Sequence, residues 1–132
     1  MAILYGASLN NVHAYTGAEL RQELQLRERI DSMSATSEEY ARLGHAMGYV
    51  SGFVDAYLQE GVRGARLAQD NLSFCLPVDF ATAELVRAVN AYLTRHREPQ
   101  VERAPASAVL AMSFREAFPC GNRTSAKRGP QK

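Results

Sequence analysis

Two cysteines and three histidines are the side chains of this sequence that could support nucleophilic catalysis. A cysteine hydrolase needs a thiolate and a nearby imidazole that accepts the thiol proton, often with a third group that orients the imidazole. Cys75 lies two residues before Pro77, and Cys120 directly follows Pro119. No helix is predicted to begin immediately after either residue and lower the pKa of its thiol. The sequence therefore does not predict an enzyme, and a hydrolase that pairs one of these cysteines with a histidine is kept as an alternative.

The surroundings of the histidines do not favour catalysis or metal binding. His45 lies inside a glycine-rich helical segment, where a histidine in the core or at an interface is expected. His96 lies between two arginines and is expected at the surface, and His13 lies in a weakly patterned N-terminal stretch. The chain has neither C-x-x-C nor H-x-x-x-H spacing, and Gly61 and Gly64 are not followed by Gly-Lys-Ser/Thr. We expect no metal and no cofactor.

The two cysteines could instead form a disulfide. A bridge between Cys75 and Cys120 would connect a long loop to the end of the last predicted helix, and the two positions are 45 residues apart. A cross-link of that span stabilises by about 4 kcal/mol if it acts through the entropy of the unfolded chain. The alternative is two buried free thiols in a cytosolic protein, and the spacing leaves both open.

The composition excludes several classes of protein. The 132 residues are 46% hydrophobic and 22% charged, as in an ordinary globular domain, and they carry a net charge of +1. No apolar run approaches the roughly 20 residues that span a bilayer. Four of the 15 basic residues lie after position 120, which leaves 11 against 14 acidic residues and a net charge of −3 in residues 1–120. We expect no nucleic-acid partner and no membrane insertion.

Hydrophobic periodicity predicts a small all-α bundle of about four main helices. The first covers residues 17–30 and the second begins near residue 37, and each follows a capping-box pattern. The third begins at Thr82 and ends before Pro99, and the fourth begins at 104–105 and ends at 119–120. The predicted organisation has three parts: a loosely ordered N-terminal segment, a helical domain and a basic flexible tail, at residues 1–15, 16–120 and 121–132.

The second helix carries two stripes with different side chains. The apolar stripe contains Tyr40, Leu43, Met47, Val50, Val54 and Tyr57 or Leu58. A stripe of small residues contains Gly44, Gly48, Gly52 and Ala56. Glycine inside a helix costs about 1 kcal/mol relative to alanine, so a close approach of another helix is expected to offset it. That helix could belong to the core of this chain or to a second copy, and the sequence leaves both open.

Four segments in order resemble one known family. They are GYVSGFVDA, FCLP, LVRAVNAYL and REAFPC, at residues 48–56, 74–77, 85–93 and 115–120. Together they resemble the Rap/Tai family, the resistance-associated and amidase-immunity proteins of type VI secretion. The resemblance covers residues 16–120 and includes both cysteines.

This resemblance implies a fold, a partner and a location. Members are helical, commonly homodimeric and exported to the periplasm, where they inhibit peptidoglycan-cleaving amidase toxins by occluding the active cleft. The cysteines that match Cys75 and Cys120 form an intramolecular disulfide, as expected in an oxidising compartment. A signal peptide is then expected to have been removed. The alternative is a periplasmic helical adaptor or structural protein of the same domain family with no toxin partner.

The inhibitory segment can be placed from the residues themselves. Occlusion of a cleft requires an exposed protrusion on a rigid base, and the long connection 59–74 after the glycine-rich helix is the best candidate. The side chains that could contact the toxin there are Arg63, Arg66, Leu67, Gln69, Asp70, Asn71 and Leu72. The alternative is a poorly ordered linker that Cys75 attaches to the body.

Overall fold

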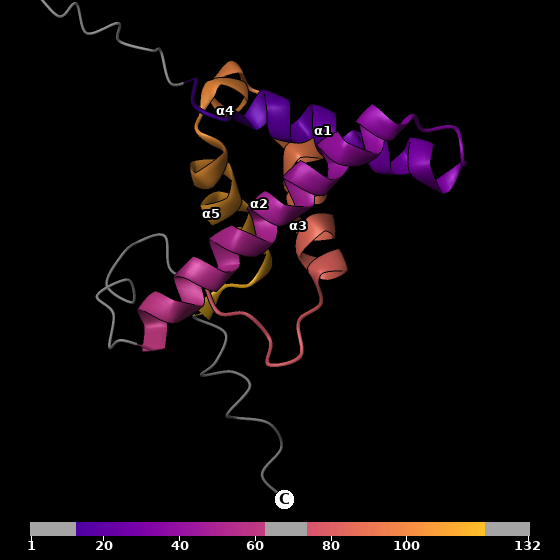
Figure 1. Cartoon of the computed structure of the whole chain (residues 1–132). Helices are drawn as coiled ribbons and strands as arrows, with labels where there is room; N and C mark the ends of the chain where they lie inside the picture. Colours follow the sequence, from indigo (N-terminus) through magenta and orange to yellow (C-terminus); the bar gives the residue numbers. More distant parts are fainter. Residues whose placement is uncertain (1–12, 63–73, 121–132) are drawn as a thin grey trace, which may run out of the picture.

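Five α-helices make up the computed structural model, which describes residues 13–62 and 74–120 (Figure 1). They are α1 Gly17–Asp31, α2 Ser37–Val62, α3 Thr82–Arg95, α4 Pro99–Arg103 and α5 Ala106–Ala117. In these residues there is no strand, and the only β-type pairing is an isolated bridge between Thr16 and Pro105. The predicted all-α bundle is confirmed.

Both predicted capping boxes are present, and they determine where the first two helices begin. The Thr16 hydroxyl accepts from the Glu19 amide at 3.4 Å, and the Glu19 carboxylate accepts from the Thr16 amide at 2.9 Å. The same reciprocal pair joins Thr36 and Glu39 at the start of α2. Gly17 has a second role, because a Cβ at this position would lie 2.2 Å from the carbonyl oxygen of Val101. Glycine therefore allows α1 to begin directly against α4.

The short helix α4 is absent from the sequence prediction. Pro99 was expected only to end the third helix, but α3 already ends at Arg95 and Pro99 is the first residue of α4. Proline suits that position because the first amides of a helix have no intrahelical acceptor and its φ angle is already helical. The fourth predicted helix is confirmed as α5, which begins at Ala106 directly after Pro105.

The helices enclose one apolar core. Helices α1 and α2 form a hairpin, α1 lies across one end of α3 and α5, and α2 crosses the bundle obliquely (Figure 1). The apolar residues of α3 that recur at helical spacing are all buried: Leu85, Val86, Val89, Tyr92 and Leu93. Leu43, Val50 and Val54 confirm most of the stripe on α2. One position of that stripe was wrong, because Tyr40 is exposed. Of the two alternatives for its last position, Tyr57 packs against the core and Leu58 is exposed.

Candidate functional site

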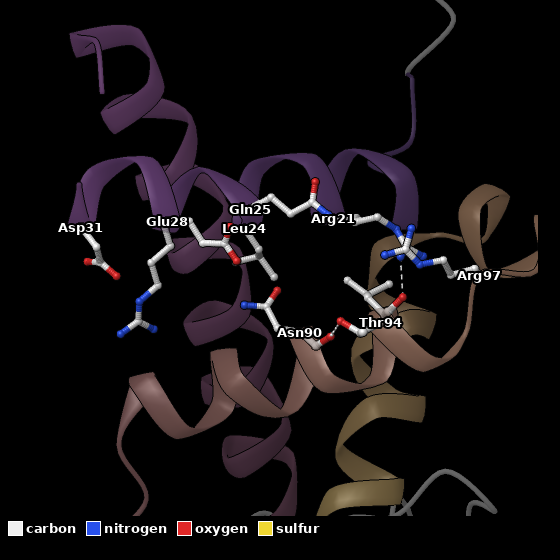
Figure 2. Close-up of a pocket in the computed structure, with 10 residues that line it drawn as sticks. Arg21, Leu24, Gln25, Glu28, Asp31, Asn90, Thr94 and Arg97 are labelled. Atoms are coloured by element: carbon white, nitrogen blue, oxygen red, sulfur yellow. Dashed lines mark hydrogen bonds between the residues drawn. The ribbon is translucent and has the colours of Figure 1, made fainter. Parts of the chain in front are cut away.

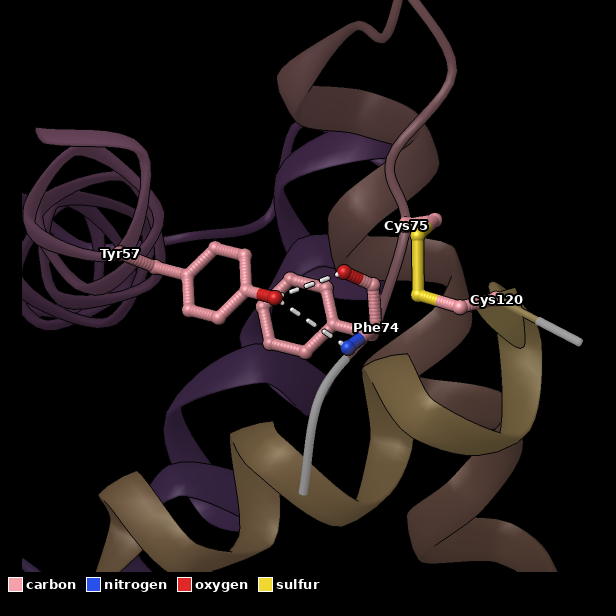
Figure 3. The surroundings of a disulfide bond; sticks show 4 residues. All are labelled: Tyr57, Phe74, Cys75 and Cys120. Atoms are coloured by element: carbon pink, nitrogen blue, oxygen red, sulfur yellow. Dashed lines mark hydrogen bonds between the residues drawn. A yellow bond between two sulfur atoms is a disulfide. The ribbon is translucent and has the colours of Figure 1, made fainter. Parts of the chain in front are cut away.

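A disulfide joins Cys75 to Cys120 and connects the chain before α3 to the end of α5 (Figure 3). The two Cα atoms are 5.0 Å apart, and the Cys75 amide donates to the carbonyl oxygen of Phe118 at 2.8 Å. The chain has only these two cysteines. Because both sulfurs are bonded, no thiol nucleophile remains, and the cysteine-hydrolase alternative fails.

Phe74, the residue before the disulfide, is part of the core and not of an exposed loop. It is only 2% exposed, and its ring stacks on Tyr57 with centroids 4.0 Å apart. The Phe74 ring also meets the ring of Phe114, with centroids 5.2 Å apart. The Tyr57 hydroxyl donates to the Phe74 carbonyl at 2.8 Å and accepts from the Phe74 amide at 3.3 Å (Figure 3). The sequence analysis missed this contact, because nothing in the local pattern pairs residues 57 and 74.

The candidate toxin-contacting residues of the sequence analysis lie outside the described part of the chain. These are Arg63, Arg66, Leu67, Gln69, Asp70, Asn71 and Leu72. The structure describes both flanks of their segment, which follows Val62 at the end of α2 and precedes the buried Phe74. The segment therefore leaves from a helix end and returns to a core residue next to the disulfide.

The small-residue stripe on α2 faces away from the rest of the described chain. A Cβ at Gly44, Gly48 or Gly52 would meet no atom of the described residues within 4 Å, and Ala56 is exposed as well. The alternative that this stripe packs inside the core of the chain is therefore wrong for the described residues. The buried face of α2 is the opposite one, which carries Val50 and Val54.

A network of polar side chains joins α1, α2 and the chain before α1. The Tyr15 hydroxyl donates to Oε2 of Glu23 at 2.6 Å, and Nδ1 of His45 lies 2.9 Å from the same oxygen. Burial, followed by the hydrogen bond to the Glu23 carboxylate, raises the pKa of Tyr15 well above its usual value of 10.0. His45 is exposed, and its ring meets the Tyr15 ring edge-on. It helps to hold the two helices together from outside the core.

The other two histidines also pair with carboxylates. His13 lies 2.9 Å from Glu19, and the pKa of Glu19 is lowered chiefly by the hydrogen bond from the Thr16 amide, with a smaller effect of His13. His96 stacks on Tyr92 and lies 3.2 Å from Glu116. Burial and the Glu116 charge raise the pKa of Tyr92. All three histidines thus have a structural partner.

Arg21 is the polar residue whose environment the sequence analysis missed. The apolar pattern of the first helix assigned it no buried role, but it is only 9% exposed. Its guanidinium donates to the carbonyl oxygens of Leu93 and His96 and pairs with Glu102 at 2.7 Å. Nε has no hydrogen-bond partner among the described residues. Arg21 therefore joins α1 to the carboxyl end of α3 and to α4.

A groove of about 300 Å³ lies between α1 and α3, with Arg21 in its wall (Figure 2). Arg97 and Asp31 line opposite ends of it, and Asn90 and Thr94 lie between them (Figure 2). Charges of both signs line this groove, so it selects no single class of ligand.

The described residues contain no group of three or more histidine, cysteine or acidic side chains that could hold a metal ion. None of the described helices is long and apolar enough to cross a membrane.

These features define a small helical protein with a disulfide at the base of a long connection and no thiol nucleophile. Residues 16–120 match the Rap1a immunity proteins, and the chain belongs to this family of type VI secretion immunity proteins. Comparisons with curated proteins and with solved structures find no match. Membership identifies the chain as a non-catalytic protein and implies that it inhibits a cognate type VI secretion toxin.

Proposed function

We propose that residues 16–120 bind a peptidoglycan-cleaving amidase toxin in the periplasm and block its active cleft. The match to the immunity family carries this proposal. The disulfide supports the location, because such bonds persist in oxidising compartments such as the periplasm. A segment that leaves from α2 and returns to the core beside this disulfide suits occlusion, since both of its flanks are anchored.

A pull-down with the product of the neighbouring gene, followed by an amidase assay, tests the proposal directly. The expected result is a stable complex in which peptide release from peptidoglycan stops at a stoichiometric amount of inhibitor. A neighbouring product that neither binds nor loses activity would instead favour the helical adaptor without a toxin partner.

The segment 63–73 is proposed to supply the residues that enter the toxin cleft. Replacing Arg66 and Asp70 together with alanine is expected to weaken toxin binding at least tenfold, because charged side chains buried in an interface are strong contributors to affinity. Isothermal titration calorimetry measures this change. The matched control is Arg87→Ala with Asp79→Ala, which removes two exposed charges of the same types elsewhere and should change affinity less than twofold. If the two double variants bind the toxin with equal affinity, the proposal that segment 63–73 enters the toxin cleft is wrong.

The exposed stripe of α2 is proposed as the contact between two copies of the chain. Gly44, Gly48 and Gly52 lower the helix propensity of α2, and no described residue packs against them. A second helix could approach closely over such a flat surface, which would offset this cost.

Replacing Gly48 with leucine is expected to convert the dimer to a monomer at micromolar concentration, because the added side chain separates the two helices. The folded protomer should keep its helix content, since the new side chain begins in open space. Light scattering coupled to size exclusion measures the mass, and circular dichroism checks the fold. Ser107→Leu, at an exposed position of α5, is the control and should leave the mass unchanged. A monomeric wild-type protein would contradict the dimer proposal.

A further inference from the structure

We infer that the turn between α1 and α2, with Met33 at its tip, is a contact surface for the toxin. This inference rests on the proposed function, in which the chain binds an amidase. The turn covers residues 32–36, and the hairpin end that it closes projects beyond α3 and α5 (Figure 1). Met33 is 90% exposed, so its side chain has little contact with the other described residues.

Hydrogen bonds fix the backbone of this turn. The Met33 amide donates to the carbonyl oxygen of Ile30 at 2.9 Å, and the Ser34 amide donates to that of Arg29 at 3.1 Å. These two bonds form a Schellman motif, which ends a helix. The Ser32 hydroxyl also donates to the Arg29 carbonyl oxygen, at 2.9 Å. Met33 therefore projects from a rigid base.

Met33 occupies the position of this motif that glycine usually takes. Its φ angle is 57°, in the left-handed region, and it is the only residue other than glycine with a positive φ in the described part of the chain. A methionine side chain makes this conformation costly. Because the side chain is exposed, burial within the chain does not offset the cost. A partner that buries the side chain on binding would use it.

Asp31 is a second residue that the fold of the single chain does not favour. It is the exposed last residue of α1, where the negative end of the helix dipole disfavours a carboxylate. It forms no ion pair with the described residues. Residues 28–40 contain four acidic residues and one basic residue, Arg29, which pairs with Glu39. The hairpin end is therefore acidic around an apolar tip.

These two properties describe the surface that would bind here, which is an apolar socket bordered by basic side chains. Methionine is enriched in protein interfaces and adapts to irregular pockets. Two copies of this acidic end would repel each other if they met, so the end does not suit a symmetric contact between protomers. The occupant is therefore the toxin and not a second copy.

Surface plasmon resonance with the amidase compares substitutions at the tip. Met33→Asn keeps a side chain that tolerates the left-handed backbone but removes the apolar contact, so binding should weaken about tenfold or more. Met33→Leu keeps an apolar side chain and should bind within about threefold of the wild type. The matched control is Val78→Asn, at an apolar residue before α3 that is 98% exposed, and it should change affinity less than about twofold.

A stability measurement separates contact with the toxin from support of the fold. Met33→Gly removes the cost of the positive φ, and Asp31→Asn removes the charge at the end of α1. Both variants should therefore raise the urea midpoint, and both should still weaken toxin binding. Asp31→Asn should act through a several-fold lower association rate constant, because complementary charges steer the encounter. A purely structural residue would not lower affinity while stability rises.

The outcomes separate this inference from the proposed function. Weak binding by Met33→Asn and Met33→Gly, with near-normal binding by Met33→Leu and Val78→Asn, supports the inference. Near-normal toxin binding by Met33→Asn overturns it, and so does equal weakening by Met33→Leu or Val78→Asn. If the wild type and all Met33 variants bind the amidase equally well, the inference is wrong and the proposed function stands. If the wild type binds no amidase, both are wrong.

Discussion

Loss of the Cys75–Cys120 disulfide is expected to lower the free energy of unfolding by about 4 kcal/mol. The bond closes a loop with a sequence separation of 45 residues, so its removal restores many conformations to the unfolded chain. A domain of this size buries a modest core, and a loss of this magnitude is a large share of its stability. The variant Cys75→Ser with Cys120→Ser is expected to be partly unfolded near 37 °C.

Urea denaturation followed by circular dichroism measures this effect. The wild-type protein in dithiothreitol should reproduce the midpoint of the double-serine variant, and the variant itself should not respond to dithiothreitol. A difference between oxidised wild type and variant below about 1 kcal/mol would contradict the entropic argument, which expects several times more. The disulfide would then serve to anchor Phe74 and not to stabilise the whole domain.

Replacing Arg21 with methionine is expected to destabilise the fold by about 3 kcal/mol or more. Methionine keeps much of the apolar volume, but it leaves the carbonyl oxygens of Leu93 and His96 without the donors that they have in the wild type. It also removes the partner of Glu102. Buried acceptors that lose their donors are costly, because water does not replace the lost hydrogen bonds.

The matched control for this substitution is Arg27→Met on the same helix. Arg27 lines the groove between α1 and α3, is less buried than Arg21 and forms no ion pair with the described residues, so its loss should change stability by about 0.5 kcal/mol or less. Chemical denaturation of both variants gives the comparison. If the two variants unfold at the same denaturant concentration, the polar contacts of Arg21 contribute nothing to stability.

Features that depend on near neighbours in the chain could be predicted from the sequence. The capping boxes at Thr16 and Thr36 are local, since each joins residues three apart. The buried face of α3 follows from helical periodicity alone, because its apolar residues recur every three or four positions. The pairing of Cys75 with Cys120 followed only after the family resemblance was added, since the spacing left free thiols open.

The errors of the sequence analysis have a common origin. Nothing near Arg21 in the sequence indicates that it is buried. Its partners are the carbonyl oxygens of Leu93 and His96 at the end of α3, which the fold brings beside it. Pro99 looks like the terminator of the third helix, but α3 ends at Arg95 and Pro99 begins α4. The position of α4 against Gly17 depends on a contact between distant segments. Phe74 looks like part of a loop, but α2 and α5 surround it with aromatic rings.

The sequence by itself determined the starts of the four longer helices, the main buried faces and, through its four ordered motifs, the family. Only the tertiary structure decided that the glycine stripe of α2 faces away from the core, that Arg21 is buried and that Tyr57 binds the backbone of Phe74. The difference arises because some of these features depend on near neighbours in the chain and others on distant segments. Propensity, capping and periodicity act within a few residues, whereas a partner for a buried polar group comes from whichever helix the fold brings alongside.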